Sequence, residues 1–346
     1  MNAHPRPPAM SDVAALAGVS HQTVSRVLNA HPSVRPQTRE RVLAAIAELG
    51  YRRNSAARAL VTRRSGALGV LTSATGHHGP ASTLLGVERA AREVGYYVSV
   101  AAVDHFEPDT LRAALDHFMD QGVEGVAIIA PQVDVAEAVN AFAAPVPTVM
   151  VTSGAGLDDT RSHDPAHRLV SVGVDQRAGA RDLVRHLVGL GHREIVHLAG
   201  GPQDWFDARD RLTGWREESS AAGLTVPEPV LCDWSADSGY RAALRLIADG
   251  LPTAILAAND QLALGVLRAC WEQGIDVPGR LSVTGFDDEV GAGFYTPPLT
   301  TVRQDFAALG RAAVAALVDS LAGTPVADLT LPATVVLRAS TAPPHP

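Results

Sequence analysis

The chain has 346 residues, of which 46% are hydrophobic and 19% are charged. These values exclude a single small module and a globally disordered protein, and they fit two or three folded domains. The net charge of −8 is unevenly distributed, since residues 1–64 carry ten arginines against three acidic residues and residues 65–346 carry 19 against 34. A basic head of +7 on an acidic body of −15 suggests a polyanion-binding segment attached to a domain with another task.

The N-terminal part predicts a Pro-rich, disordered arm (1–9) followed by a helix-turn-helix domain (10–53). Ser11 is placed to cap a short helix that ends at Gly18, and Ser20 to cap a second helix, His21–Leu28. A third helix fits Pro36–Leu49, with Gly50 just past its end. The expected inward-facing side chains are Val13, Leu16, Ala17, Val24, Val27, Leu28, Val42, Leu43, Ile46 and Leu49.

Residues 54–65 are expected to form a short helix and a linker. The segment Asn54–Leu60 has a capping Asn and good helix formers, but it is only about two turns long. Isolated helices of that length are marginal in water, so this one needs a partner surface.

From residue 67, apolar runs alternate with amphipathic segments, which predicts parallel, doubly wound α/β sheets in two lobes. The expected strands are Ala67–Ser73, Tyr97–Asp104, Gly125–Pro131, Pro147–Ser153, Leu169–Asp175, Glu194–Gly200, Val230–Trp234, Ala254–Asp260 and Leu281–Asp288. The expected helices are Thr83–Val94, Thr110–Gln121, Arg177–Leu190, Ala208–Ala222, Gly239–Asp249, Gln261–Gln273 and Phe306–Leu321.

Polar residues end several of these strands, where parallel sheets bind ligands. They are Ser73, Thr152, Asp175, Asn259, Asp260, Asp287 and Asp288. Mixed hydroxyl, amide and carboxylate groups suit a neutral polyol, whose hydroxyls both donate and accept. Trp205, Arg209, Arg211 and Trp234 add aromatic faces and cations for a sugar ring. Helix capping explains Asp175 and Asp260 equally well, and core packing is the commoner role of a Trp.

Enzymatic and metal signatures are largely missing. The chain lacks GxSxG, GxxxxGK[ST] and GxGxxG motifs, and its His pairs do not combine with Cys or Glu at a ligand spacing, so neither cofactor nor metal is expected. Cys232 and Cys270 are expected to be free, buried thiols. The start of the chain has no apolar signal region, and no run of about 18 apolar residues occurs, which predicts a cytoplasmic protein without membrane spans.

The headpiece sequence from Asp12 to Asn29, DVAALAGVSHQTVSRVLN, resembles the LacI/GalR family of bacterial transcription regulators. The resemblance continues through Thr38–Val42 and Asn54–Leu60, and it returns in the core. The core motifs are DARDRLTGW (207–215), DWSADSG (233–239), ANDQLALG (258–265), VTGFDD (283–288) and PPLTTVRQDF (297–306). It therefore covers about residues 10–340.

The resemblance implies a homodimeric repressor of sugar-utilisation genes that binds double-stranded operator DNA. It implies base reading by His21, Gln22 and Arg26, backbone contacts from Ser20, Thr23, Asn29 and Asn54, and a wedge by Leu60 in the minor groove. The segment 54–60 would then be a hinge helix that folds against DNA.

The resemblance also implies a core (66–346) like periplasmic sugar-binding proteins, with lobe 1 at about 66–172 and 304–332 and lobe 2 at about 173–303 and 333–340. A small sugar, a galactoside or related glycoside, would bind between them and release the operator. Its implied contacts are Ser73, Arg211, Trp234, Asn259, Asp287, Gln304 and Phe306.

The chain departs from the family pattern in three respects. Ala130 stands where an amide side chain is expected and Thr152 where a carboxylate is expected, which leaves the sugar's identity open. No leucine heptad tail follows, so a tetramer is not expected. Two other classes stay open: a regulator that needs its effector to bind DNA, and a sugar-binding or sugar-modifying protein on the same α/β lobes.

Overall fold

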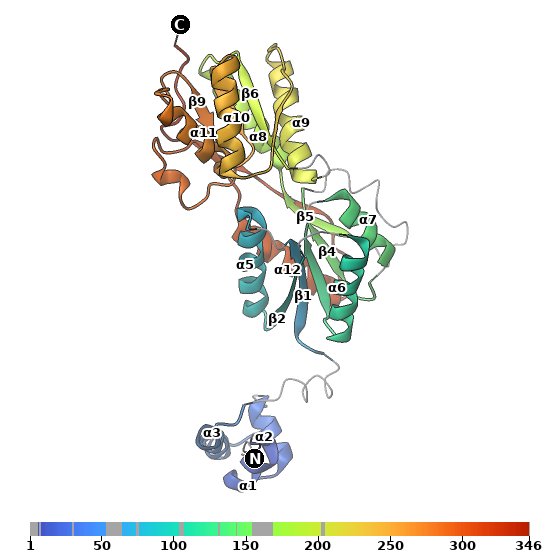
Figure 1. Ribbon diagram of the computed structural model, residues 1–346. Helices are drawn as coiled ribbons and strands as arrows, with labels where there is room; N and C mark the ends of the chain where they lie inside the picture. Colours follow the sequence, from blue (N-terminus) through green and yellow to red (C-terminus); the bar gives the residue numbers. More distant parts are fainter. Residues whose placement is uncertain are drawn as a thin grey trace, which may run out of the picture. The chain divides into compact units, whose positions relative to one another are not determined.

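The computed structural model describes residues 6, 8–29, 31–52, 64–73, 76–103, 107–130, 132–142, 144–153, 169–201 and 205–345. The chain divides into two compact units, Met1–Ser65 and Gly66–Pro346 (Figure 1). The predicted disordered arm and hinge helix, including Asn54 and Leu60, fall largely on residues outside the described ranges.

The first unit consists of three helices around a small core. They are α1 (Met10–Ala17), α2 (His21–Leu28) and α3 (Pro36–Leu49). The bounds of α2 and α3 are those predicted, with Ser20 capping α2 and Gly50 ending α3 at φ 62°, a left-handed conformation that favours glycine. The core contains Val13, Ala14, Ala17, Val24, Val27, Val42, Ala45 and Tyr51.

Three details of this unit differ from the sequence prediction. Helix α1 is capped at Ala9 instead of Ser11, because the Asp12 carboxylate accepts a hydrogen bond from the Ala9 amide at 2.7 Å. Leu16 and Leu43 are 46% and 51% exposed. In α3, Val42 and Ala45 face the core three residues apart, which turns Leu43 away from it.

The first lobe of the second unit is built on a six-stranded parallel sheet in the order β11-β5-β4-β3-β1-β2. Its strands are β1 (Ala67–Ser73), β2 (Tyr97–Val103), β3 (Gly125–Ile129), β4 (Thr148–Val151), β5 (Val170–Val174) and β11 (Leu329–Leu331). Since β5 runs to Val174, this sheet extends two residues past the expected end of lobe 1 near residue 172.

Helices cover both faces of this sheet (Figure 1). They are α5 (His78–Glu93), α6 (Pro108–Asp120), α7 (Val133–Phe142) and α12 (Phe306–Leu321). Leu71 and Ile128 pack in the cluster that contains α6 and α7 residues, whereas Val70 and Ile129 pack in the cluster of α5 and α12. Adjacent strand residues thus bury opposite faces, which explains why the strands read as continuous apolar runs.

The second lobe repeats this design on a four-stranded parallel sheet in the order β7-β6-β8-β9. Its strands are β6 (Ile195–Gly200), β7 (Val230–Cys232), β8 (Ala254–Ala257) and β9 (Ser282–Thr284). Its helices are α8 (Gln176–Gly189), α9 (Phe206–Ala221), α10 (Ala236–Asp249), α11 (Asp260–Glu272) and a 3-10 turn, Ala292–Phe294. The predicted α/β class with doubly wound parallel sheets is confirmed.

A two-stranded antiparallel ladder of β10 (Thr301–Arg303) and β12 (Thr334–Val336) completes the unit. The sequence did not predict α7, β10, β11 or β12. The three strands have three residues each, too few for a recognisable pattern. Cys232 and Cys270 are buried and unpaired, as expected. No described helix has the length and apolar character needed to cross a bilayer.

Candidate functional site

Helix α2 presents one polar face to solvent. Val24 and Val27 are buried, whereas His21, Gln22 and Arg26 are exposed. This separation follows from the helical period, since the two valines lie three residues apart on the core side. The three predicted base-reading side chains therefore share the exposed part of the helix.

The predicted phosphate contacts lie at the two ends of α2. The Ser20 hydroxyl accepts a hydrogen bond from the Thr23 amide at 3.2 Å and lies 2.9 Å from the Thr23 hydroxyl. Asn29 follows the last turn and is exposed. These placements are compatible with the predicted backbone contacts, which remain predictions.

A second candidate site is a pocket of about 690 Å³ in the second unit, lined by residues of both lobes and open to solvent. Six of the seven predicted effector contacts line it: Arg211, Trp234, Asn259, Asp287, Gln304 and Phe306. Ser73 is buried at the end of β1 and is not among the lining residues. The first lobe lines the pocket with the segment His77–Pro80 at the start of α5 and with the ends of β3 and β4, including Ile129 and Thr152.

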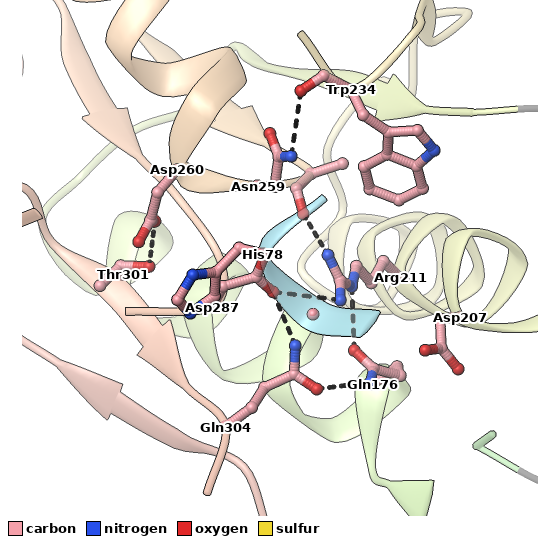
Figure 2. Close-up of polar contacts among 12 residues, drawn as sticks. His78, Gln176, Asp207, Arg211, Trp234, Asn259, Asp260, Asp287, Thr301 and Gln304 are labelled. Atoms are coloured by element: carbon pink, nitrogen blue, oxygen red, sulfur yellow. Dashed lines mark hydrogen bonds and ion pairs between the residues drawn. The ribbon is translucent and has the colours of Figure 1, made fainter. Parts of the chain in front are cut away.

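Four buried side chains form a closed ring of polar contacts in this pocket (Figure 2). Arg211 donates to Gln176 Oε1 at 2.9 Å and pairs with Asp287 Oδ1 at 3.4 Å. Gln176 donates to Gln304 Oε1 at 2.8 Å, and Gln304 donates to Asp287 Oδ1 at 2.6 Å. Arg211 also donates to the Ala258 carbonyl. The ring satisfies groups that would otherwise be costly to bury.

The ring joins the lobes through the places where the chain crosses between them. Arg211 lies on α9 and Asp287 follows β9, both in the second lobe. Gln176 begins α8 two residues after the last residue of β5, and Gln304 lies between β10 and α12. Gln176 was not predicted as a site residue, although its position just after an expected strand was a signal for it.

The turn after β9 has a strained backbone, which directs its two carboxylates to different partners. Asp287 and Asp288 have φ of 108° and 54°, values that non-glycine residues rarely adopt. Asp287 thereby enters the ring, while Asp288 pairs with Arg303 at 2.7 Å and Arg338 at 2.6 Å. Burial raises the pKa of Asp287, and the Arg211 charge opposes that rise.

Two indoles and three smaller rings line one part of the pocket. The Trp205 and Trp234 rings lie 5.7 Å apart between centroids, and His77 meets Trp205 edge-on at 6.2 Å. His78 meets Phe306 edge-on at 5.4 Å. Both indole N–H groups are buried and have no hydrogen-bond partner in the described part of the chain. Such surfaces suit the C–H faces of sugar rings.

Three other candidates from the sequence have different roles. Arg209 is exposed and stacks on Phe206, because α9 turns Asp207 and Arg211, four residues apart, toward the pocket instead. Asp175 caps α8 by accepting from the Ala178 amide at 2.8 Å, so the capping reading applies. Asn259, and not Asp260, caps α11, and its amide also donates to the Trp234 carbonyl at 3.1 Å.

Within the described ranges, no three His, Cys, Asp or Glu side chains are grouped so as to hold a metal ion.

Two family models match the chain. The model of bacterial regulatory proteins of the lacI family matches residues 9–54, and that of the periplasmic binding protein-like domain matches residues 184–341. The match to the first model covers the whole of α1, α2 and α3.

Full-length relatives and solved structures agree with these matches. The chain is 37% identical to the lactose operon repressor of Escherichia coli strain K12 over 98% of this chain and 92% of that protein. It is 35% identical to the regulator CelR of Thermobifida fusca over 96% of each. The structure of the lac repressor dimer bound to operator and the anti-inducer ONPF matches with a TM-score of 0.87 and 37% identity over 97% of this chain and 100% of that chain. The chain therefore belongs to the LacI family of bacterial regulatory proteins and is a DNA-binding regulator of transcription.

Proposed function

We propose that this regulator is a repressor whose second unit binds a small neutral sugar and thereby lowers the affinity of the first unit for operator DNA. The observation that carries the proposal is the pocket, whose polar ring and indole pair come from both lobes and from the crossings between them. A CelR–cellobiose complex, similar in structure with a TM-score of 0.70 and 32% identity over 96% of this chain and 99% of that chain, supports a sugar as the ligand class.

The switch follows from this placement of the ligand residues. A sugar that contacts Arg211 on one lobe and Phe306 on the other favours one arrangement of the lobes over others. A ligand shifts an equilibrium only by its difference in affinity between the two states, and this geometry supplies such a difference. If the operator-binding form is the other arrangement, sugar binding releases DNA.

The protein acts as a homodimer in this proposal, in the cytoplasm where the chromosomal operator lies. Large apolar side chains are exposed on both lobes of the second unit, with Leu85, Tyr97 and Val100 on one and Trp271, Val290 and Phe294 on the other. These side chains are the candidate association surface, because association would remove them from water. Two headpieces would match the two half-sites of a palindromic operator.

The experiment uses a DNA site selected by the purified protein from a random duplex library. Fluorescence anisotropy measures its affinity with and without lactose, cellobiose or maltose, for the wild type and for Asp287→Asn. The variant should bind the DNA as the wild type does, because Asp287 lies outside the first unit, but the effective sugar should release it at least tenfold less readily.

Each other result contradicts a stated part of the proposal. A sugar that tightens wild-type DNA binding reverses the sign of the switch and indicates a corepressor. Equal release of wild type and variant removes Asp287 from the effector site. Failure of every sugar to bind the wild type excludes these three as effectors.

A further inference from the structure

We propose that the Asp207 carboxylate accepts a hydrogen bond from a hydroxyl group of the effector. Asp207 belongs to the second lobe, and the first lobe holds one of its two oxygens. This inference rests on the proposed function and deepens it. No carboxylate was expected from this position, and the resemblance to the family places one at Thr152, at the end of β4, instead.

The position of Asp207 makes it a pocket residue. It lies in the first turn of α9, four residues before Arg211, so both side chains share the helix face that lines the pocket. Figure 2 shows its carboxylate beside Arg211 but outside the ring of hydrogen bonds, with no dashed line to the other residues drawn. The polar groups of the ring are already engaged with one another, whereas Asp207 is not part of that exchange.

The first lobe anchors Asp207 through one oxygen. The Ser153 amide, which follows β4, donates to Asp207 Oδ1 at 3.1 Å. A carboxylate can accept several hydrogen bonds, and Asp207 lines the pocket, so we infer that it accepts one more from a ligand hydroxyl. Burial raises the pKa of Asp207. The Arg211 charge, the Ser153 amide and the side chains of Ser153 and Thr152 oppose that rise.

The neighbours of Asp207 hold this part of α9 against the first lobe. Phe206 is 1% exposed and packs in the same cluster as Met150 and Leu169 of lobe 1, although its helix packs on α8 and β6 of lobe 2. Trp205 forms a backbone bridge with Gln132, which follows β3. Asp207 is therefore fixed relative to both lobes, as a specific hydrogen-bonding group must be.

The surroundings of Asp207 select for a neutral, hydroxyl-bearing ligand. The buried indole N–H groups of Trp205 and Trp234 lack partners among the described residues, and both side chains line the same pocket. A carboxylate acceptor and polar indoles in one pocket suit hydroxyls, which donate and accept. Arg211 is the arginine among the described lining residues and is already bound to Asp287, Gln176 and Ala258, so a phosphate group would meet the Asp207 carboxyl group without that cation to balance it. We therefore expect sugar phosphates to be rejected.

The test compares Asp207→Asn with the wild type and with Asp237→Asn. Asparagine can still accept from the Ser153 amide through its carbonyl oxygen, which leaves an NH₂ donor where Oδ2 stood. Asp237 has the same charge but lies on α10 in a surface pair with Arg241, 71% exposed, so its variant controls for the loss of one charge. Calorimetry measures the binding of lactose, cellobiose and maltose, and then of monodeoxy derivatives of the sugar that binds.

Asp207→Asn should weaken binding of the parent sugar by about 10- to 100-fold, the range for a hydrogen bond to a charged group. Asp237→Asn should bind as the wild type does. One monodeoxy sugar should bind wild type and Asp207→Asn equally, because it lacks the hydroxyl that Asp207 reads. A role in lobe packing alone would weaken all derivatives by the same factor.

Two results overturn the inference while leaving the proposed function intact: unchanged affinity of Asp207→Asn for the parent sugar, or an equal loss for the parent and every deoxy derivative. Tight binding of a sugar 6-phosphate by the wild type would likewise contradict it. Absence of binding by the wild type to all three sugars would instead count against the proposed function.

Discussion

Asp260 shows how a single buried residue links the pocket region to pH. It is fully buried at the start of α11, where its carboxyl group contacts the Thr301 hydroxyl at 2.5 Å and the Glu289 amide at 2.8 Å. Burial, reinforced by the charge of Asp287, raises the pKa of Asp260 from 3.8 to about 8. The Thr301 hydroxyl and the Glu289 amide both donate to this carboxyl group and oppose the rise, but burial outweighs them, so the folded chain favours the neutral acid.

The sign of the resulting pH dependence follows from this raised pKa. The folded state holds a proton that the unfolded state releases. The contribution of Asp260 to the free energy of unfolding is therefore fully present below about pH 4 and is lost as the pH rises to about 8. Asp260→Asn mimics the neutral acid. From pH 5.5 to 7.5 its free energy of unfolding should rise relative to wild type by up to about 1.4 kcal/mol per pH unit. Urea titrations at both pH values measure this, and a constant difference between the two proteins would contradict it.

Arg26 is the residue on which the sequence preference of α2 should depend. It is exposed beside the buried Val27, and a guanidinium can donate two hydrogen bonds to guanine. Arg26→Ala should cost about 1–3 kcal/mol on the selected DNA site and much less on random duplex, measured by anisotropy. Arg41→Ala, an exposed arginine on α3, is the control and should weaken both complexes alike. Equal losses for Arg26→Ala on both DNAs would assign it to the phosphate backbone.

At the scale of elements, the crossing of α5 and α12 depends on two glycines in contact. A Cβ on Gly86 would lie 2.5 Å from the Phe306 carbonyl oxygen, and one on Gly310 would lie 2.2 Å from the Gly86 carbonyl carbon. Both neighbours are backbone atoms, so the helices would have to separate. Because α12 begins at Phe306, this contact also positions one wall of the pocket.

Gly86→Ala should therefore lower the free energy of unfolding by about 1–3 kcal/mol through overpacking, and should weaken sugar binding as Phe306 moves. Gly189→Ala is the matched control, since this helical glycine of α8 has no neighbour within 4 Å of a new Cβ. That variant should be neutral or more stable by up to about 1 kcal/mol. Equal stability of the two variants would show that the α5–α12 contact tolerates a methyl group.

At the scale of the whole molecule, we expect the protein to act as a dimer. The exposed apolar side chains of the second unit are the candidate dimer surface. Phe294 is 87% exposed and Val290 88% exposed in adjoining turns, so a charge placed there should not disturb the fold. Phe294→Glu should shift the protein from dimer to monomer in analytical ultracentrifugation and weaken operator binding more than tenfold, since two half-sites would no longer be engaged together.

A charge substitution elsewhere on the surface provides the control for that experiment. Asp237→Lys changes the charge of an exposed residue on α10 and should leave the dimer intact. A fully dimeric Phe294→Glu protein would mean that another surface joins the chains.

Much of this architecture was readable from local sequence. Strict helical spacing and Ser20 and Gly50 as end signals predicted α2 and α3 to the residue, and all nine apolar runs contain a strand. Motifs spread over the whole chain predicted the family, and six of the seven expected effector residues meet in one pocket. These features depend on the residues within a single element or motif, which is the information that one segment of sequence carries.

Tertiary structure alone decided which side chains meet. The ring of Arg211, Gln176, Gln304 and Asp287 joins residues up to 128 positions apart, and its formation depends on strained φ angles at Asp287 that no local pattern indicates. Likewise, Asp207 reaches Ser153 only because Phe206 is buried in the core of the other lobe. Capping could be predicted for Asp175 but pocket lining could not be predicted for Gln176, because the first requires three neighbouring residues and the second requires two packed lobes.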